Sequence, residues 1–266
     1  MPVGHIVPVF LLVFATAICV ATAYSLRGNT AAGAPISFYG FDGIGVIAGF
    51  IAYVLITTAL GTAFGISLLA ALMLHELGHV LAYRMLGHQN TRFRLVPLIS
   101  GLPISDKPLK TEGEVFFVAL MGPGFSLAPM VLEAALSVYL AAPMPGVANY
   151  LRIFAIAVGT LNFVNLLPIW PLDGGRCARI AARNFWPALA PAMTVFISAA
   201  LAAASLRTGS LALMVFAGVG ALSLVRKGEK LSNPLGADTG LIALAAYTFT
   251  MAAHFLGGWT LLQTLF

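Results

Sequence analysis

About eight stretches of roughly twenty apolar residues, joined by short polar connections, make up most of the 266-residue sequence. A helix of roughly 20 apolar residues crosses the hydrocarbon core of a bilayer, which is about 30 Å thick. Only 9% of the residues are charged, against about 25% in soluble domains. The sequence therefore predicts an all-α polytopic membrane protein. The predicted spans are 6–25, 43–60, 66–86, 115–140, 149–168, 187–205, 209–225 and 240–262.

The basic residues indicate how these spans are oriented. If the N-terminus lies outside and the spans alternate, twelve of the fourteen Lys and Arg residues fall in inside connections, and only Arg152 and Arg207 fall outside. Because Lys and Arg accumulate in cytoplasmic loops, we expect this multi-pass topology. The net charge of +5 then reflects orientation in the lipid bilayer. Charge confined to short connections argues against a nucleic-acid partner.

The chain is predicted to form a single membrane domain over 1–266. Its longest polar stretch, 87–114, is too short for a soluble accessory domain. The segment ATA at 21–23 resembles a signal-peptide cleavage site, but no basic segment precedes the first apolar stretch. We therefore expect that stretch to be a retained span.

An H-E-x-x-H pattern lies inside the third predicted span, at His75, Glu76 and His79. Residues four apart share one face of a helix, so both imidazoles can point at one metal ion. Glu76 can instead reach a water held by that metal. Ionisable residues inside a membrane are costly and usually functional, which favours a metal site over a buried His–Glu pairing. The pattern predicts two zinc ligands and a general base.

A catalytic zinc needs a third protein ligand and an open position, and the intramembrane carboxylates are Glu133 and Asp173. His79 lies near the inner end of its predicted helix, roughly 10 Å below the inner surface at about 1.5 Å per residue. Asp173 follows a span that ends on the same side, whereas Glu133 lies toward the outer side. We therefore expect Asp173 to be the third ligand and Glu133 to pair with Arg152.

The stretch LNFVNLLPIWPLDGGR around Asp173 is rich in helix-breaking residues. Pro168 and Pro171 lack a backbone N–H and disrupt a helix, and Gly174 and Gly175 allow a tight turn after the carboxylate. Irregular backbone at membrane depth occurs only where protein or water covers it. We expect this segment to line a wet cavity; the alternative is a helix that simply ends at the membrane surface.

H-E-L-G-H in an apolar helix, followed about ninety residues later by N-x-x-P-x-x-P-L-D-G, resembles the site-2 protease family of intramembrane zinc metalloproteases. The resemblance covers residues 65–176 and implies a three-helix zinc-protease core. The predicted core is 66–176, with helices at 66–86, 115–140 and 149–168, and the accessory helices lie in 1–60 and 187–266.

The resemblance also implies an activity. Zn2+ held by His75, His79 and Asp173, with Glu76 as general base, would hydrolyse peptide bonds in the transmembrane helix of a membrane-protein substrate. Asn165 would help to hold the substrate backbone or the developing oxyanion. The resemblance implies a bacterial cytoplasmic (inner) membrane, with the active site near its cytoplasmic face.

Two further segments bear on the resemblance. Many family members carry Asn where this chain has Ser126, after Gly122 and Pro123, so we interpret the Gly-Pro pair as a kink for close packing. Neither 141–148 nor the C-terminal segment has room for a PDZ-like or CBS-like domain, which corresponds to a compact form of the family.

The segment TRFRLVPLISGLPIS at 91–105 combines strand formers with Pro97 and Pro103. Proline suits edge strands, and family members have a membrane-associated β-loop here. We expect such a loop, with Leu98 and Ile99 in an edge that holds the unwound substrate by strand addition. An ordinary cytoplasmic loop is the alternative.

Two other functions are compatible with the same residues. A transporter or metal permease would use the His, Glu and Asp cluster together with His254, although such proteins often contain paired repeats, and neither motif has a second copy. A non-cleaving homologue would bind membrane segments without hydrolysis. A fourth protein ligand would close the open zinc position, so His254 is expected to be a packed core residue. Nothing in the sequence indicates an oligomeric state.

Overall fold

A computed structural model describes residues 6–27, 36–39, 43–94, 104–183, 185–225, 233 and 235–265 of the chain. The chain is mostly helical, with one two-stranded sheet. In order, the elements are α1 (Ile6–Leu26), β1 (Ser37–Tyr39), α2 (Gly43–Leu60), α3 (Thr62–Met85), β2 (Arg92–Arg94), α4 (Glu112–Tyr139), α5 (Pro145–Asn165), α6 (Asp173–Ala182), α7 (Leu189–Thr208), α8 (Leu211–Val225) and α9 (Ala237–Leu265).

Each of the eight predicted apolar stretches coincides with a helix. Six of these helices, α1, α3, α4, α5, α7 and α9, are long and apolar enough to cross a membrane, as expected for an integral membrane protein. The apolar helices Gly49–Leu60 in α2 and Leu213–Val225 in α8 are shorter. Within the described residues, six of the eight predicted spans are thus candidate membrane spans by length and composition. The short helix α6 was not predicted.

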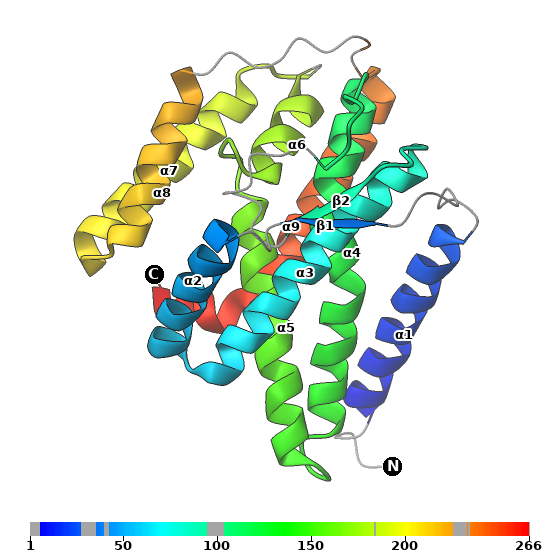
Figure 1. Cartoon of the computed structure of the whole chain (residues 1–266), viewed down its shortest axis with the longest axis vertical. Helices are drawn as coiled ribbons and strands as arrows, with labels where there is room; N and C mark the ends of the chain where they lie inside the picture. The colour runs from blue at the N-terminus through cyan, green and yellow to red at the C-terminus, as the bar shows by residue number, and fades with distance from the viewer. Residues whose placement is uncertain are drawn as a thin grey trace.

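The centre of the molecule is formed by α3, α4, α5 and α9 (Figure 1). The first three pack on one another, as the predicted core requires, and α9 packs against α5, α4 and α6. Helix α1 lies against α4, and α2 lies against α3. Helices α7 and α8 form a hairpin on the side opposite α1, where α7 contacts α6. Helix α9 lies in the segment predicted to be accessory, yet it contributes the buried Tyr247 and His254 to this centre.

Small residues allow α9 to lie close to α5. A Cβ atom added to Gly159 would collide with the backbone of Gly257 and Gly258, and one added to Gly258 would lie 2.7 Å from the Thr160 nitrogen. Closely approaching helix backbones at small residues are typical of membrane proteins, where packing drives helix association. This contact fixes α9 against the helix that leads to the Asp173 segment.

Polar contacts tie the start of α4 to α6 and α9. Thr111 and Glu114 form a capping box, in which each side chain accepts a hydrogen bond from the other residue's backbone N–H. The buried Glu112 carboxylate forms an ion pair with Arg183, which follows α6. It also accepts a hydrogen bond of 3.3 Å from the Leu235 N–H just before α9. These contacts hold α6 in place from its C-terminal end.

The described residues of the 91–105 segment take part in a short sheet with residues 37–39. Strands β1 and β2 pair in parallel, with Phe38 opposite Phe93, and Thr91 forms an antiparallel bridge with Ser105. Phe93 and Ile104 pack against Val80 of α3, which directly follows His79. The sheet therefore lies beside the H-E-x-x-H segment. The predicted edge strand at 98–99 falls outside the described residues.

Candidate metal centre

Three predicted ligand side chains converge in the centre of the molecule. The Nε2 atoms of His75 and His79 lie 3.0 Å apart, and each lies 3.2 Å from Oδ2 of Asp173. All three residues are buried, with exposed fractions of 4%, 6% and 8%. Within the described ranges, they form the one group of three or more His, Cys, Asp or Glu side chains whose arrangement could hold a metal ion.

Hydrogen bonds on the far side of each imidazole determine which nitrogen faces the cluster. Nδ1 of His79 lies 2.8 Å from the Val118 carbonyl oxygen, which can only accept a hydrogen bond. Nδ1 of His75 lies 2.7 Å from Oδ1 of Asn162, and the Asn162 amide nitrogen donates to Val158 O at 2.9 Å. Both Nδ1 atoms therefore carry the proton, which leaves each Nε2 lone pair free to bind a metal.

The distances and the donor types fit Zn2+. Three acceptor atoms at 3.0–3.2 Å repel one another unless a cation lies between them. Zinc binds imidazole nitrogen and carboxylate oxygen at about 2.0–2.2 Å in tetrahedral sites, so that neighbouring ligand atoms lie about 3.3 Å apart. Three protein ligands leave one tetrahedral position for water or substrate, which is the composition of a catalytic rather than a structural zinc site.

The segment that carries Asp173 is broken, as its prolines predict. Helix α5 ends at Asn165, and the chain continues without a helix through residues 166–172. Two contacts hold this loop: Tyr247 of α9 donates a hydrogen bond of 2.7 Å to the Leu166 carbonyl, and Thr194 of α7 donates one to the Pro168 carbonyl. To bind a metal ion, the Asp173 carboxyl must be ionised.

The predicted tight turn after Asp173 is wrong. Asp173 is the first residue of α6, and Gly174 and Gly175 lie in the first turn of that helix. A Cβ atom on Gly174 would collide with the Leu166 backbone, and one on Gly175 would lie 2.6 Å from the Ile169 carbonyl carbon. The two glycines therefore allow α6 to begin directly against the loop before it, which brings Asp173 to the imidazoles.

Glycines also bring α3 and α4 together at the imidazoles. A Cβ atom on Gly78 would collide with the Met121 carbonyl oxygen, and one on Gly122 would lie 2.6 Å from the His79 ring and 2.9 Å from the His75 ring. The buried Ser126 hydroxyl donates to the Gly122 carbonyl within α4. Residue 122 therefore serves close packing, in agreement with the interpretation of the Gly-Pro pair.

The structure places the other predicted site residues as follows. Glu76 lies next to His75 in α3 and is 1% exposed. Asn165 is the last residue of α5 and is half-buried. His254 is fully buried in α9, where its Nε2 lies 2.9 Å from the Pro123 carbonyl oxygen, and it is not part of the three-residue group.

The expected ion pair between Glu133 and Arg152 does not form among the described residues. Glu133 lies beside a cavity of about 290 Å³ that Ser67 and Tyr150 also line. Arg152 instead donates a hydrogen bond of 3.0 Å to the Asn149 side chain in the same helix. Depth along the two helices suggested the pairing, but depth does not determine the direction in which each side chain projects around its helix.

Sequence reasoning did not single out Asn162, although it directly contacts a predicted ligand. Its position within the apolar helix 145–165 could have pointed to it. A fully buried amide such as that of Asn162 needs hydrogen-bond partners, and inside an apolar helix such partners must come from other polar groups of the protein. Its two partners, His75 and Val158, fix the orientation of the amide. Asn162 therefore fixes both the tautomer and the orientation of the His75 ring.

Replacing Asn162 with leucine is expected to lower zinc affinity by about 10- to 100-fold, the usual effect of losing a partner of a metal-bound histidine. Leucine has a similar size, but it cannot accept the Nδ1 proton. Competition with a fluorescent zinc chelator would measure the affinity. Asn165→Leu, three residues later in the same helix, is the control and should leave zinc affinity near the wild-type value. Equal affinities for Asn162→Leu and the unmodified protein would contradict this role.

The comparisons with known proteins found relatives that match less than half of the chain. The chain is 35% identical over 126 residues to "Putative zinc metalloprotease Rip3" from two strains of Mycobacterium tuberculosis, a match that covers 45% of this chain and 31% of the relative. It is 32% identical over 116 residues to "Putative zinc metalloprotease sll0528" from Synechocystis sp., covering 44% of this chain and 30% of that relative. The chain thus spans less than a third of the length of these curated relatives.

No family model matches the chain, and no solved structure matches it. The relatives are named as zinc metalloproteases, and the chain carries the two motifs on which the resemblance rests. The structure places their His and Asp side chains in one cluster that fits Zn2+. Together, these findings show that part of the chain is similar to proteins named as zinc metalloproteases and that the chain carries a side-chain cluster that fits Zn2+.

Proposed function

We propose that this chain is an intramembrane zinc metalloprotease that hydrolyses peptide bonds in the transmembrane segments of membrane proteins. The observation that carries the proposal is the buried cluster of two imidazoles and one carboxylate, with the Glu76 carboxylate in the same helical turn of a candidate membrane span. The names of the relatives support a protease. The excess of basic residues in the predicted inside connections supports a site near the cytoplasmic face of a bacterial inner membrane.

His75, His79 and Asp173 would hold Zn2+ in this proposal. When bound, the ion lowers the pKa of a water and polarises the scissile carbonyl. The chain supplies the orientation: the Val118 carbonyl and the Asn162 amide hold the two rings so that both Nε2 atoms face the Asp173 carboxylate. Burial of the cluster excludes bulk water and strengthens the electrostatic interactions within it.

Glu76 would act as the general base and then as the general acid. Its carboxylate accepts a proton from the attacking water as the water oxygen bonds to the scissile carbonyl carbon. It then donates that proton to the amide nitrogen as the C–N bond breaks, which yields a carboxylic acid and an amine. The carboxylate returns to its initial ionisation state, so the cycle needs no further reactant.

A substrate helix would have to unwind before cleavage, because each of its interior amides is hydrogen-bonded within the helix. Two features of the chain could pair with the released backbone groups. Asn165 lies at the end of α5, seven residues before the loop ends at Leu172. The sheet that contains β2 lies against α3 beside His79 and could accept an extended segment by strand addition.

Incubation of the purified protein with a model transmembrane peptide in detergent tests the proposal. We expect cleavage within the apolar segment, loss of cleavage after zinc is removed with a chelator, and recovery when zinc is restored. Mass spectrometry of the products would locate the cut. Undiminished cleavage by protein that elemental analysis shows to be free of metal would refute the proposed mechanism, and so would a cut confined to the polar flanks of the peptide.

A further inference from the structure

Arg176 contacts the metal-ligand cluster directly. Among the described residues, it is the one Lys or Arg side chain that forms an ion pair with a ligand of the candidate metal centre: its Nη1 lies 3.9 Å from Oδ1 of Asp173. The other carboxylate oxygen, Oδ2, lies 3.2 Å from both imidazole Nε2 atoms. The guanidinium therefore approaches the cluster through the Asp173 oxygen that the imidazoles do not contact.

The Arg176 guanidinium has hydrogen-bonding capacity left over. A distance of 3.9 Å is longer than a hydrogen bond of about 2.7–3.2 Å, so the contact with Asp173 is an ion pair without a hydrogen bond. In the part of the chain that the structure describes, no other residue accepts a hydrogen bond from this group. The side chain is 45% exposed, so its several N–H donors can reach a second acceptor.

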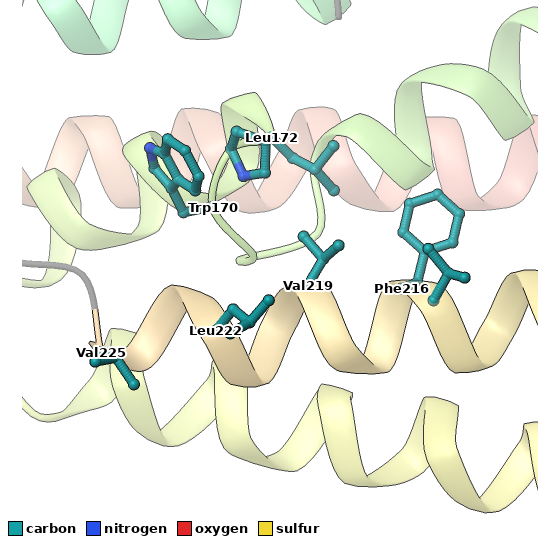
Figure 2. A pocket seen from close by; sticks show the side chains of 8 residues that line it. Trp170, Leu172, Phe216, Val219, Leu222 and Val225 are labelled. Carbon is teal, nitrogen blue, oxygen red and sulfur yellow. The ribbon is translucent and has the colours of Figure 1, made fainter.

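The backbone before Arg176 is held in place, whereas the side chain can move. In the loop before α6, Ile169 packs with Ala217 of α8, and Leu172 and Val219 pack on the same cluster. Figure 2 shows Leu172, the last residue of this loop, on the side that faces Val219. An exposed arginine side chain has many rotamers. A shift of the guanidinium by a few ångströms therefore requires no movement of the loop or of Asp173.

The guanidinium lies within reach of the open position of the metal centre. The two oxygens of one carboxylate are about 2.2 Å apart, so Nη1 of Arg176 lies within about 6 Å of Oδ2 of Asp173. In a tetrahedral zinc site, a fourth ligand atom lies about 3.3 Å from each of the other three. An oxygen at the open position and the Arg176 guanidinium would thus both be neighbours of the same carboxylate oxygen.

Charge balance at the cluster favours an anion as the additional ligand. With Zn2+ bound, the carboxylates of Asp173 and Glu76 offset the charge of the ion, and Arg176 leaves one positive charge in excess. An uncompensated charge at a buried site is costly, and a single anionic group would neutralise it. Peptide hydrolysis supplies such a group, because the acid formed on the carbonyl side of the cleaved bond loses its proton to the released amine at neutral pH.

Resting on the proposed function, we propose that Arg176 binds the carboxylate of the carbonyl-side product of cleavage. The ligand class is a peptide that ends in a free α-carboxylate. Arginine suits this ligand because its planar guanidinium can donate two parallel hydrogen bonds to the two carboxylate oxygens. A peptide that ends in a neutral carboxamide lacks the charge and one of the two acceptors, so it binds more weakly.

Paired peptides test this proposal. Two fluorescent apolar peptides have the same sequence and end in either a free carboxylate or a carboxamide, and fluorescence anisotropy gives their affinities for the full-length protein in detergent at saturating zinc. The unmodified protein should prefer the carboxylate. Arg176→Gln is expected to lower the carboxylate-to-carboxamide ratio of affinities by about tenfold or more, the usual effect of losing a hydrogen bond to a charged group. Arg176→Lys should retain part of the preference, because it keeps the positive charge.

Arg179→Gln is the matched control, because Arg179 is exposed on the same helix and forms no ion pair with the cluster in the described structure. It should preserve the ratio. An unmodified protein without a carboxylate preference, an unchanged ratio in Arg176→Gln, or the same fall in both variants would overturn the proposal. Weaker zinc binding by Arg176→Gln with an unchanged ratio would also overturn it, and would show that Arg176 only orients Asp173.

This binding measurement requires no cleavage, so the two proposals can fail separately. A fall in the ratio for Arg176→Gln alone, without any cleavage by the unmodified protein, would refute the protease function and leave the carboxylate site standing. Cleavage by the unmodified protein with an unchanged ratio in Arg176→Gln would refute the role of Arg176 alone. Neither cleavage nor a change in the ratio would refute both.

Discussion

Replacing Glu76 with glutamine is expected to slow cleavage of a transmembrane peptide by a factor of about 10² to 10⁴, the usual contribution of a general base, while the protein still binds zinc. The amide has nearly the same shape as the carboxylate, but it cannot accept the proton of the attacking water. Glu76 is not one of the three clustered ligands, so the metal should remain. Single-turnover kinetics would measure the rate, and elemental analysis would measure the zinc content.

Glu133→Gln provides the matched control, because it makes the same chemical change at another glutamate within a candidate membrane span. It should retain nearly the full rate of cleavage, since Glu133 lies beside a separate cavity. If Glu76→Gln cleaved as fast as the unmodified protein, Glu76 could not be the base. A comparable loss of rate in Glu133→Gln would show that the effect is not specific to the metal centre.

Replacing Asp173 with asparagine is expected to lower zinc affinity by more than the roughly 10- to 100-fold typical of outer partners, and to lower cleavage with it. The variant loses the negative charge that balances the cation, and a neutral amide oxygen binds a metal ion more weakly than a carboxylate oxygen does. Titration with a competing chelator would give the affinity, and peptide cleavage at saturating zinc would show whether added metal restores the rate.

Asp238→Asn is the matched control for this variant. Asp238 also lies in the first turn of a helix, but it is exposed at the start of α9. Its replacement should change neither zinc affinity nor cleavage. Wild-type affinity in Asp173→Asn would show that the carboxylate does not bind the metal, and the account of the site as a three-ligand centre would fail.

Local patterns in the sequence predicted the parts of the site that depend on one element. His75 and His79 are four residues apart on one helix, so helical periodicity alone puts them on one face. The prolines at 168 and 171 predicted the break after α5. Asp173 required more, because its approach to α3 depends on the packing of distant segments. The predicted depth of Asp173 in the membrane selected it over Glu133, and the motif resemblance implied the same ligand.

Contacts between distant segments were not predictable in the same way. The hydrogen bond between Asn162 and His75 joins residues 87 apart in sequence, and the bond from Tyr247 to the Leu166 carbonyl joins residues 81 apart. Neither pair has a local pattern, since each depends on how one helix is rotated against another. The same rotation explains why the pairing of Glu133 with Arg152 was wrong.

The two imidazoles are held by partners of different kinds, and this difference affects how the chain tolerates mutation. The partner of His79 is the carbonyl of residue 118, which every amino acid provides, so the side chain at that position can change without removing the acceptor. The partner of His75 is the side chain of residue 162, and most substitutions there remove it. A single substitution at residue 162 can therefore remove the hydrogen bond that orients His75. The hydrogen bond that orients His79 survives any side-chain replacement at residue 118, because its acceptor belongs to the backbone.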